Sequence, residues 1–365
     1  MFIPHCPFMD ASSPIIAIDV MGSDLGPGEI ITGIGSALKE RRDYGVILVG
    51  DQKIICEHLQ RQKIEDTERL EIVHASEVIA MGEKPLQALR VKKDASMVRA
   101  IELVRSGKVN AMLSCGNTGS LMAGSTLKLR PMPGVERPTL ATMVPTLNHY
   151  IVITDVGANP NTTPLQMMHN AILGSDYCFR ILGIEQPRIG LLTIGTEEGK
   201  GNETSIAAHD LLKSMGTIIN YFGLIEGFQI FQGEVDLVLC DGFVGNILLK
   251  TLESLVIQLQ GYIRSEFKAN WVRMLGALLA RGVFGALKRR LNPETYGAAS
   301  LLGLNGVVLK SHGSSNWRAI RSAINMAVSV ANKEARENCL GRITHANEIY
   351  EASLLNRSFK ASDVR

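Results

Sequence analysis

GLLTIGTEEGKGNE, residues 190–203, runs from a short apolar segment directly into a polar, glycine-rich loop. The segment that follows, Ser205–Met215, has the periodicity of an amphipathic helix. A buried strand, a tight loop and a helix in this order form the unit from which parallel sheets are built. The stretch therefore predicts an α/β fold.

The same unit recurs along most of the chain. Short apolar runs rich in β-branched residues alternate with longer helical segments, which implies βαβ crossovers and a largely parallel sheet covered by helices on both faces. The predicted strands are Ile15–Val20, Val46–Val49, Ala111–Ser114, Tyr150–Thr154, Arg188–Ile194, Thr217–Phe222 and Asp236–Cys240. The clearest further helices are Ser96–Ser106 and Ile247–Gln260.

The composition agrees with this fold class. The 365 residues are 45% apolar, which is enough for a large core, and they include 35 glycines but only 5% aromatic residues. Many glycines and few aromatic residues favour strand-to-helix turns over a β-sandwich. The net charge is +2 and no strongly basic domain stands out, which indicates that nucleic acid is not a partner.

Nothing in the sequence indicates export or a membrane span. No run of about 18 apolar residues occurs. Residues 1–13 lack the pattern of a signal peptide, so we expect a flexible N-terminal extension there. The six cysteines are scattered without a CxxC pair, which indicates free thiols in a reducing compartment. These features predict a cytoplasmic protein.

The rest of the chain is expected to form one unit. Neither a repeat of fixed period nor a low-complexity linker interrupts residues 14–350, which predict a single α/β domain. A division of this domain into two lobes stays open. Residues 351–365 are expected to form a C-terminal tail.

Segment 261–291 differs from the rest in charge, because it carries seven basic residues against one acid, a local charge of +6. As a helix it has an apolar face and a basic face opposite. The apolar face consists of Trp271, Leu275, Leu278 and Leu279, and the basic face includes Arg273 and Arg281. Glycines inside the segment, each costing about 1 kcal/mol relative to alanine in a helix interior, predict a kinked helix.

Four predicted strands end in clusters of glycine with Asn, Asp, Thr or Lys. The clusters are Ser114–Ser120, Asp155–Asn159, Gly195–Glu203 and Asp241–Asn246. Because the carboxyl ends of parallel strands lie along one edge of a sheet, we expect these loops to converge on one cleft. Glycine lets backbone N–H groups approach an anion closely, and Asn and Thr add neutral donors. The set predicts a site for phosphate and a polarised carbonyl group.

Standard catalytic motifs do not account for these clusters. Gly195–Lys200 lacks the spacing and the hydroxyl residue of a Walker A loop, and Gly33–Gly35 lacks the third glycine of a dinucleotide fingerprint. No HExxH, paired Cys/His set or GxSxG occurs, so neither a metal site nor a nucleophilic serine is predicted. Cys115 and Cys240 lie at strand ends, but free cysteines are most often inert core residues, so catalysis through a cysteine is not expected.

A series of short blocks, in this order along the chain, resembles the bacterial fatty acyl-ACP:phosphate acyltransferase family (PlsX). The blocks are Ile18–Asp24, Lys84–Lys93, Ser96–Met97, Gly116–Gly119, Asp155–Asn159, Gly195–Glu197, Lys200–Glu203, Asp241–Asn246, Tyr296–Gly297 and His312–Ser315. Three positions depart from the family's usual residues, each by a small side chain: Ser23, Ala95 and Cys115.

The resemblance implies a three-layer α/β/α sandwich similar to the phosphotransacetylase and isocitrate/isopropylmalate dehydrogenase folds, usually as a homodimer. It also implies reversible transfer of an acyl group from acyl carrier protein (ACP) to inorganic phosphate, without a cofactor. The acyl phosphate would feed a membrane glycerol-3-phosphate acyltransferase that starts phosphatidic acid synthesis.

Direct attack of phosphate on a thioester assigns roles to the strand-end residues. Phosphate must be held, the developing oxyanion needs neutral donors, and a proton must leave the phosphate. The candidate catalytic residues are Lys200, Asn202, Asp241, Asn246 and His312. The candidate phosphate- or substrate-binding residues are Asp19, Gly22, Asp24, Gly116, Asn117, Thr118, Gly119, Asp155, Asn159 and Ser314. Which residue acts as the general base stays open.

Alternatives remain for both the basic segment and the whole chain. Segment 261–291 suits a dimer interface, an anionic lipid surface at the inner face of the cytoplasmic membrane, or docking of acidic ACP. The whole chain also suits a phosphotransacetylase that uses short acyl-CoA, or a non-catalytic lipid- or carrier-binding protein. A dehydrogenase is disfavoured by the missing dinucleotide fingerprint. The preferred acyl chain length stays open.

Overall fold

The structure, a computed structural model, describes residues 13–65, 68–147, 149–291, 298–331 and 333–362. The predicted N-terminal extension lies almost entirely outside the described residues, as does the block Tyr296–Gly297. The segment predicted as a C-terminal tail begins inside a long helix, α12 (Lys333–Ser362).

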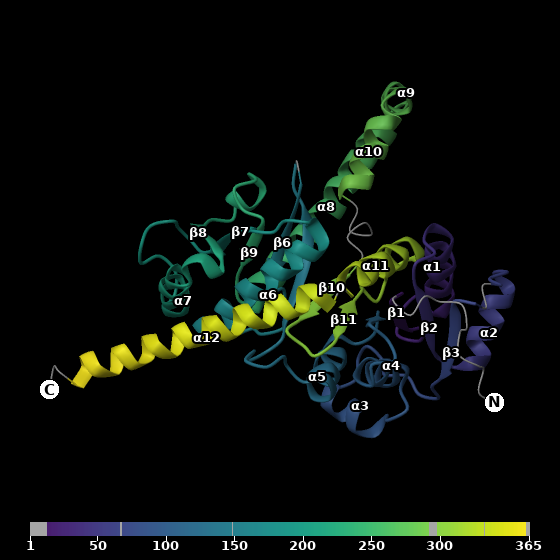
Figure 1. Ribbon diagram of the computed structural model, residues 1–365. Helices are drawn as coiled ribbons and strands as arrows, with labels where there is room; N and C mark the ends of the chain where they lie inside the picture. Colours follow the sequence, from purple (N-terminus) through teal and green to yellow (C-terminus); the bar gives the residue numbers. More distant parts are fainter. Residues whose placement is uncertain (1–12, 66–67, 148, 292–297, 332, 363–365) are drawn as a thin grey trace.

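One eleven-stranded sheet runs through the described part of the chain (Figure 1), in the order β3-β2-β1-β4-β11-β10-β5-β6-β9-β7-β8. The first-half strands are β1 (Ile15–Asp19), β2 (Gly45–Gly50), β3 (Leu70–His74) and β4 (Ala111–Ser114). The second-half strands are β5 (Thr139–Pro145), β6 (Tyr150–Thr154), β7 (Arg188–Leu192), β8 (Asn220–Ile225) and β9 (Leu237–Leu239). The chain then returns to the centre of the sheet through β10 (Ala299–Leu302) and β11 (Val307–Lys310).

The strands on the two sides of the antiparallel centre of the sheet run in opposite directions. Strands β3, β2, β1, β4 and β11 are mutually parallel, and so are β6, β9, β7 and β8. Between them, the pairs β11–β10, β10–β5 and β5–β6 are all antiparallel. Three reversals leave β6 antiparallel to β4. We call the edge where β1, β4 and β11 end the first edge, and the edge where β6, β7 and β9 end the second edge.

Helices cover both faces of the sheet, which confirms the three-layer α/β/α architecture. One apolar core lies between the sheet and α1, α2, α6, α7, α11 and α12, and the other between the sheet and α4, α5 and α8. The helices not yet given bounds are α1 (Pro27–Glu40), α2 (Gln52–Arg61), α3 (Pro85–Val91), α4 (Ser96–Arg105), α5 (Thr118–Leu129), α6 (Pro164–Leu182), α7 (Glu203–Ser214), α8 (Gly242–Lys268), α9 (Trp271–Leu279), α10 (Arg281–Leu291) and α11 (Trp317–Val330).

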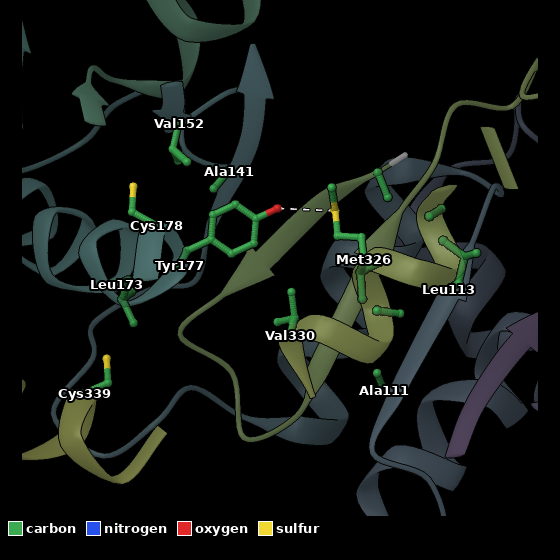
Figure 2. Packing of buried hydrophobic residues seen from close by; sticks show 14 of the residues in the cluster. Ala111, Leu113, Ala141, Val152, Leu173, Tyr177, Cys178, Met326, Val330 and Cys339 are labelled. Carbon is green, nitrogen blue, oxygen red and sulfur yellow. Dashed lines mark hydrogen bonds between the residues drawn. The ribbon is translucent and has the colours of Figure 1, made fainter. Parts of the chain in front are cut away.

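Helix α6 shows how local sequence defines these elements. Thr163 caps its amino terminus and forms a reciprocal capping box with Gln166, next to a proline in the first turn. Gly183 ends the helix in the left-handed conformation, with φ of 71°. Its buried Tyr177 lies between strands of the sheet and α11, where its hydroxyl contacts Met326 Sδ at 3.4 Å (Figure 2). This contact joins α6 to α11, the helix that packs against α1.

The predicted strand Thr217–Phe222 is partly wrong. Residues Gly216–Ile218 form a 3₁₀ turn, and the strand occupies Asn220–Ile225 instead. Gly216 has φ of 52°, a left-handed conformation that glycine adopts readily, so the chain turns before it can extend. Four strands that the sequence did not reveal, β3, β5, β10 and β11, complete the sheet.

Segment 261–291 is helical, as predicted, and belongs to an arm formed by α8, α9 and α10 that projects from the body (Figure 1). The first turns of α8 pack on the sheet through Leu248, Leu249 and Leu252. Farther along, α9 has no buried residue, and Trp271 and Leu279 are 74% and 82% exposed. By length and composition alone, α8 also qualifies as a candidate membrane span, with 11% of the relevant window buried.

Candidate active site

Asp19 is the polar centre of the first edge. It ends β1, is 1% exposed, and accepts hydrogen bonds from the hydroxyls of Ser96 and Ser114, each at 2.6 Å. The backbone N–H of Met21 donates to the same carboxylate. Burial raises the pKa of Asp19, although the hydrogen bonds from Ser114 and Ser96 oppose that shift. The buried Asp19 carboxylate therefore holds together the loop after β1, the end of β4 and the start of α4.

Gly22 and Gly116 bring two strand-end loops into contact above Asp19. A Cβ added at Gly22 would lie 2.7 Å from Asp19 Oδ2 and 2.8 Å from the backbone nitrogen of Gly116. One added at Gly116 would lie 2.6 Å from Met97 Cε. Packing therefore requires glycine at position 22, because a larger residue there would separate the β1 and β4 loops, whereas a larger residue at position 116 would first displace the flexible end of Met97.

Lys310, which the sequence did not single out, lies at the end of β11 beside these loops. Its Nζ donates to the carbonyl oxygen of Cys115 at 3.0 Å and to that of Ser311. Burial lowers the pKa of Lys310, and the nearby carboxylates Asp19 and Asp24 oppose this shift. A single lysine in an otherwise apolar strand does not by itself indicate a functional site. The polar block that follows it, His312–Ser315, was the sequence feature that indicated this part of the chain.

The turn after Lys310 is held against the β1 loop. Asp24 N donates to the carbonyl oxygen of Gly313 at 2.9 Å, and Ser23 Oγ donates to the same oxygen at 3.2 Å. The Oγ of Ser314 lies 2.8 Å from His312 Nδ1. Burial lowers the pKa of His312, and Lys250 of α8 lowers it further. A lowered pKa favours the neutral imidazole, which is the form able to accept a proton.

The amino terminus of α5 completes the first edge. Asn117 caps the helix by accepting from Ser120 N at 2.9 Å, while its Nδ2 donates to the carbonyl oxygens of Met81 and Glu83. The side chain of Asn117, which was predicted to bind phosphate or substrate, is thus occupied by the protein. The first turn, including Thr118 and Gly119, still presents backbone N–H groups of the kind that bind anions.

At the second edge, Asp155 and Asn159 stabilise their own loop. Asp155 accepts from the backbone N–H groups of Gly157, Ala158 and Asn159 at 2.7–3.0 Å, and from Asn159 Nδ2 at 3.0 Å. Asn159 Nδ2 also donates to the carbonyl oxygen of Pro138. Burial raises the pKa of Asp155. Both residues were predicted to bind substrate, and the structure gives each of them loop-holding contacts.

Asp241 and Asn246 lie beside this loop at the start of α8. Asp241 caps the helix by accepting from Val244 N at 2.8 Å. A Cβ on Gly245 would overlap the carbonyl oxygen of Asp155, so the two loops pack backbone to backbone. The side chain of Asn246 is exposed near Gly157 and remains able to reach a ligand.

The β7 loop carries Lys200 and Asn202. Asn202 caps α7 and accepts from the backbone N–H and the hydroxyl of Ser205 at 2.8 and 2.7 Å. Lys200 is exposed, and its ammonium group makes no salt bridge with the described residues. Gly199 and Gly201 have φ of 85° and 107°, so this loop depends on glycine at both positions.

The prediction that all four loops share one sheet edge is wrong. The Ser114–Ser120 loop lies at the first edge with the β1 and β11 loops, whereas the other three lie at the second edge, because the sheet reverses direction between β4 and β6. Helix α8 links the two edges instead. It begins at the second edge, and its Lys250 and Glu253 lie close enough to His312 to shift the pKa of that histidine.

The two cysteines at strand ends are buried. Cys115 is 1% exposed, and burial raises the pKa of its thiol to about 12. Burial also raises the pKa of Cys240. Both are therefore neutral thiols at physiological pH, and a thiol is a much weaker nucleophile than a thiolate. Among the described residues, no group of three His, Cys, Asp or Glu side chains is arranged to hold a metal ion.

The predicted docking residues Trp271, Arg273, Leu275, Leu278, Leu279 and Arg281 all lie on the arm, which Figure 1 shows projecting away from the sheet. The apolar members are between 52% and 82% exposed. Arg273 forms a salt bridge with Glu266 of α8, which partly offsets the positive charge of the arm.

Comparison with known proteins gives a consistent result. Residues 15–338 match a family described as fatty acid synthesis protein. The chain is 42% identical to the phosphate acyltransferase of Nitratidesulfovibrio vulgaris (strain DP4) over 337 residues, which cover 92% of this chain and 96% of that protein. It is 40% identical to the phosphate acyltransferase of Brevibacillus brevis over 323 residues, 88% of this chain and 95% of that protein.

Solved structures share the fold at low sequence identity. A phosphotransacetylase from Streptococcus pyogenes superposes with a TM-score of 0.59 at 16% identity, covering 88% of this chain and 94% of that one. The EutD phosphotransacetylase from Staphylococcus aureus gives a TM-score of 0.56 at 14% identity, covering 89% and 96%.

Proposed function

Because this chain belongs to the fatty acid synthesis protein family and is a phosphate acyltransferase, we propose that it transfers a fatty acyl group from the thioester of acyl-ACP to inorganic phosphate. The products are acyl phosphate and free ACP, and the reaction is reversible. The acyl phosphate then supplies a membrane glycerol-3-phosphate acyltransferase for phosphatidic acid synthesis.

We place the phosphate at the first edge, and the observation that carries this is the position of Lys310. Its ammonium group lies between two strand-end loops, beside the amino terminus of α5. A cation and helix N–H groups together favour a bound anion. At the second edge the polar atoms of Asp155 and Asn159 are taken up by loop contacts, as are those of Asp19 and Asn117 at the first edge, so the cation decides between the two edges. Lys200 remains the rival candidate there.

The chemistry follows from this placement. A phosphate oxygen attacks the thioester carbonyl carbon, a C–O bond forms, and the C–S bond breaks to release the carrier thiolate. A thiol has a pKa of about 8.5, so its thiolate leaves with little help from an acid. We assign the proton that the phosphate loses to His312 at the same edge, because its lowered pKa favours the neutral imidazole. Neither step involves an acyl-enzyme, in keeping with the raised pKa values of Cys115 and Cys240.

Phosphate-dependent thiol release from purified long-chain acyl-ACP tests this function directly. We expect free thiol to accumulate only when phosphate is present, together with hydroxylamine-sensitive acyl phosphate. Thiol release that is independent of phosphate would identify a thioesterase instead. No release under any condition would support the non-catalytic alternative.

A second candidate, a phosphotransacetylase for short acyl-CoA, is favoured by the fold shared with the Streptococcus pyogenes and Staphylococcus aureus phosphotransacetylases. The same assay with acetyl-CoA in place of acyl-ACP separates the two. We expect the long-chain carrier thioester to have the higher kcat/KM, and a clear preference for acetyl-CoA would reverse the assignment.

We also propose that the arm joins two copies of the chain and rests on the inner face of the cytoplasmic membrane. The exposed apolar side chains along α8, including Ile257 and Tyr262, suit a second copy, while the apolar face of α9 with its neighbouring basic residues suits anionic lipid. Sedimentation velocity of Ile257→Glu tests the dimer, and vesicle co-sedimentation of Leu275→Glu tests lipid binding. Behaviour identical to that of the parent chain would contradict the respective role.

A further inference from the structure

The short helix α3 carries a patch of exposed cations and exposed apolar side chains. We define the α3 patch as Lys84, Leu86, Arg90, Val91 and Lys93. Residues 84–93 contain four basic residues and no acid. Lys92 is used internally, because its Nζ donates to Glu83 Oε1 and to the carbonyl oxygen of Val78. Lys84 and Arg90 are exposed, and so is Lys93, whose Nζ also donates to the carbonyl oxygen of Leu89 at 3.1 Å.

The apolar members of the patch face solvent as well. Leu86 is 67% exposed and Val91 is 69% exposed, whereas Ala88 is buried and, with Leu89, packs α3 onto the body. A seven-residue helix needs only that buried side to stay in place. Two exposed aliphatic side chains among cations that make no salt bridge within the described part of the chain form a surface of the kind that protein partners contact.

The α3 patch adjoins the first edge. The amide of Asn117 donates to the carbonyl oxygens of Met81 and Glu83, just before α3. A Cβ on Gly119, in the first turn of α5, would lie 2.6 Å from Pro85 Cγ, in the first turn of α3. A partner seated on α3 therefore sits beside the proposed phosphate site.

The charge of the patch selects the partner. Exposed lysine and arginine around a small apolar centre complement an acidic protein surface with a few aliphatic side chains, and such complementarity raises the association rate. The arm fits this role less well, since Arg273 is already paired with Glu266 and α9 and α10 project away from the body (Figure 1).

We propose that the α3 patch is the docking surface for the acidic carrier protein that delivers the acyl thioester. The proposal rests on the proposed function and adds to it the place where the donor binds. A carrier docked beside α5 can deliver its thioester, held on a flexible linker, to the phosphate at the first edge. The carrier itself stays outside the site.

The test compares three charge-reversal variants. The first carries Lys84→Glu and Arg90→Glu on the patch, so that each of the three variants reverses two charges. The matched control carries Arg105→Glu and Lys108→Glu, exposed positions before β4 at its opposite end. Binding of fluorescently labelled acyl carrier is measured by anisotropy, so the result does not depend on catalysis. We expect the patch variant to weaken binding at least tenfold and the control to change it less than twofold.

Turnover then shows whether docking or chemistry is affected. With acyl-ACP the patch variant should raise KM with little change in kcat, and with a small acyl thioester that has no carrier it should match the parent chain. Equal losses on both donors would overturn the proposal, because the patch would then act on the reacting site. Unchanged carrier binding would also overturn it, as would a loss confined to an arm variant, Arg273→Glu with Arg281→Glu. If the parent chain binds the acyl carrier but gives no phosphate-dependent turnover, the proposed function is refuted and the docking proposal is not.

Discussion

Replacing Lys310 by methionine tests where phosphate binds. Methionine keeps most of the length of the side chain but removes the charge and both hydrogen bonds to the carbonyl oxygens of Cys115 and Ser311. A hydrogen bond between charged groups contributes about 1.5–3 kcal/mol. If Lys310 binds phosphate through one such bond, the KM for phosphate should rise about 10- to 150-fold.

The stability of this variant must be measured alongside its activity. Two carbonyl groups lose a donor, which costs about 1–3 kcal/mol for each group that stays buried without a partner. Part of that cost is offset because a buried charge is removed as well. We therefore expect a modest decrease in Tm, with most molecules still folded at 25 °C, and kinetics are compared at that temperature.

The assay follows phosphate-dependent release of the carrier thiol over a range of phosphate concentrations. The comparison variant is Lys200→Met, in which an exposed lysine without a salt bridge among the described residues is removed, so the Tm should not change. A KM for phosphate that is unchanged in Lys310→Met but raised in Lys200→Met would refute our placement and move the phosphate to the second edge. Increases in both would indicate one phosphate contacted from both edges.

Three further outcomes follow from contacts at the two edges. Asp155→Ala leaves three backbone N–H groups without their acceptor, so the free energy of unfolding in urea should fall by about 3–5 kcal/mol, and a change below 1 kcal/mol would show that the loop holds itself. Cys115→Ala should retain activity, and maleimide at pH 7.5 should leave Cys115 unlabelled in the folded protein, because burial raises the pKa of its thiol to about 12. Lys250→Met removes a charge that lowers the pKa of His312, so this pKa should rise in an NMR titration and the acid limb of the pH–rate profile should move to higher pH; an unmoved limb would exclude His312 as the base.

The sequence predicted the fold class because its signal is local. Strands β1, β4 and β6 are short apolar runs that are buried on both faces, and they were found within one or two residues of their observed bounds. The direction reversal was missed because it depends on hairpins. The strands of β5–β6 and of β10–β11 follow each other closely in the chain, and a pattern of strand and helix alternation does not distinguish such pairs from crossovers.

The site was harder to predict because the same residue types serve two purposes. Asp and Asn after a strand bind phosphate in some loops and cap the next helix in others. Asn117, Asn202 and Asp241 proved to be helix caps in this structure. Lys310 was overlooked for the opposite reason, since its importance depends on β11 lying next to β4, a pairing between distant parts of the chain.

The central position of β11 bears on how the protein is made. Lys310 and Cys115, which are hydrogen-bonded across the first edge, lie 195 positions apart. A nascent chain that has emerged only as far as α10 contains Asp19 and Ser114 but has neither β11 to pair with β4 nor α11 to cover α1. The proposed phosphate site is therefore assembled only after β11 has been synthesised, and nascent chains that end before Lys310 are expected to be inactive.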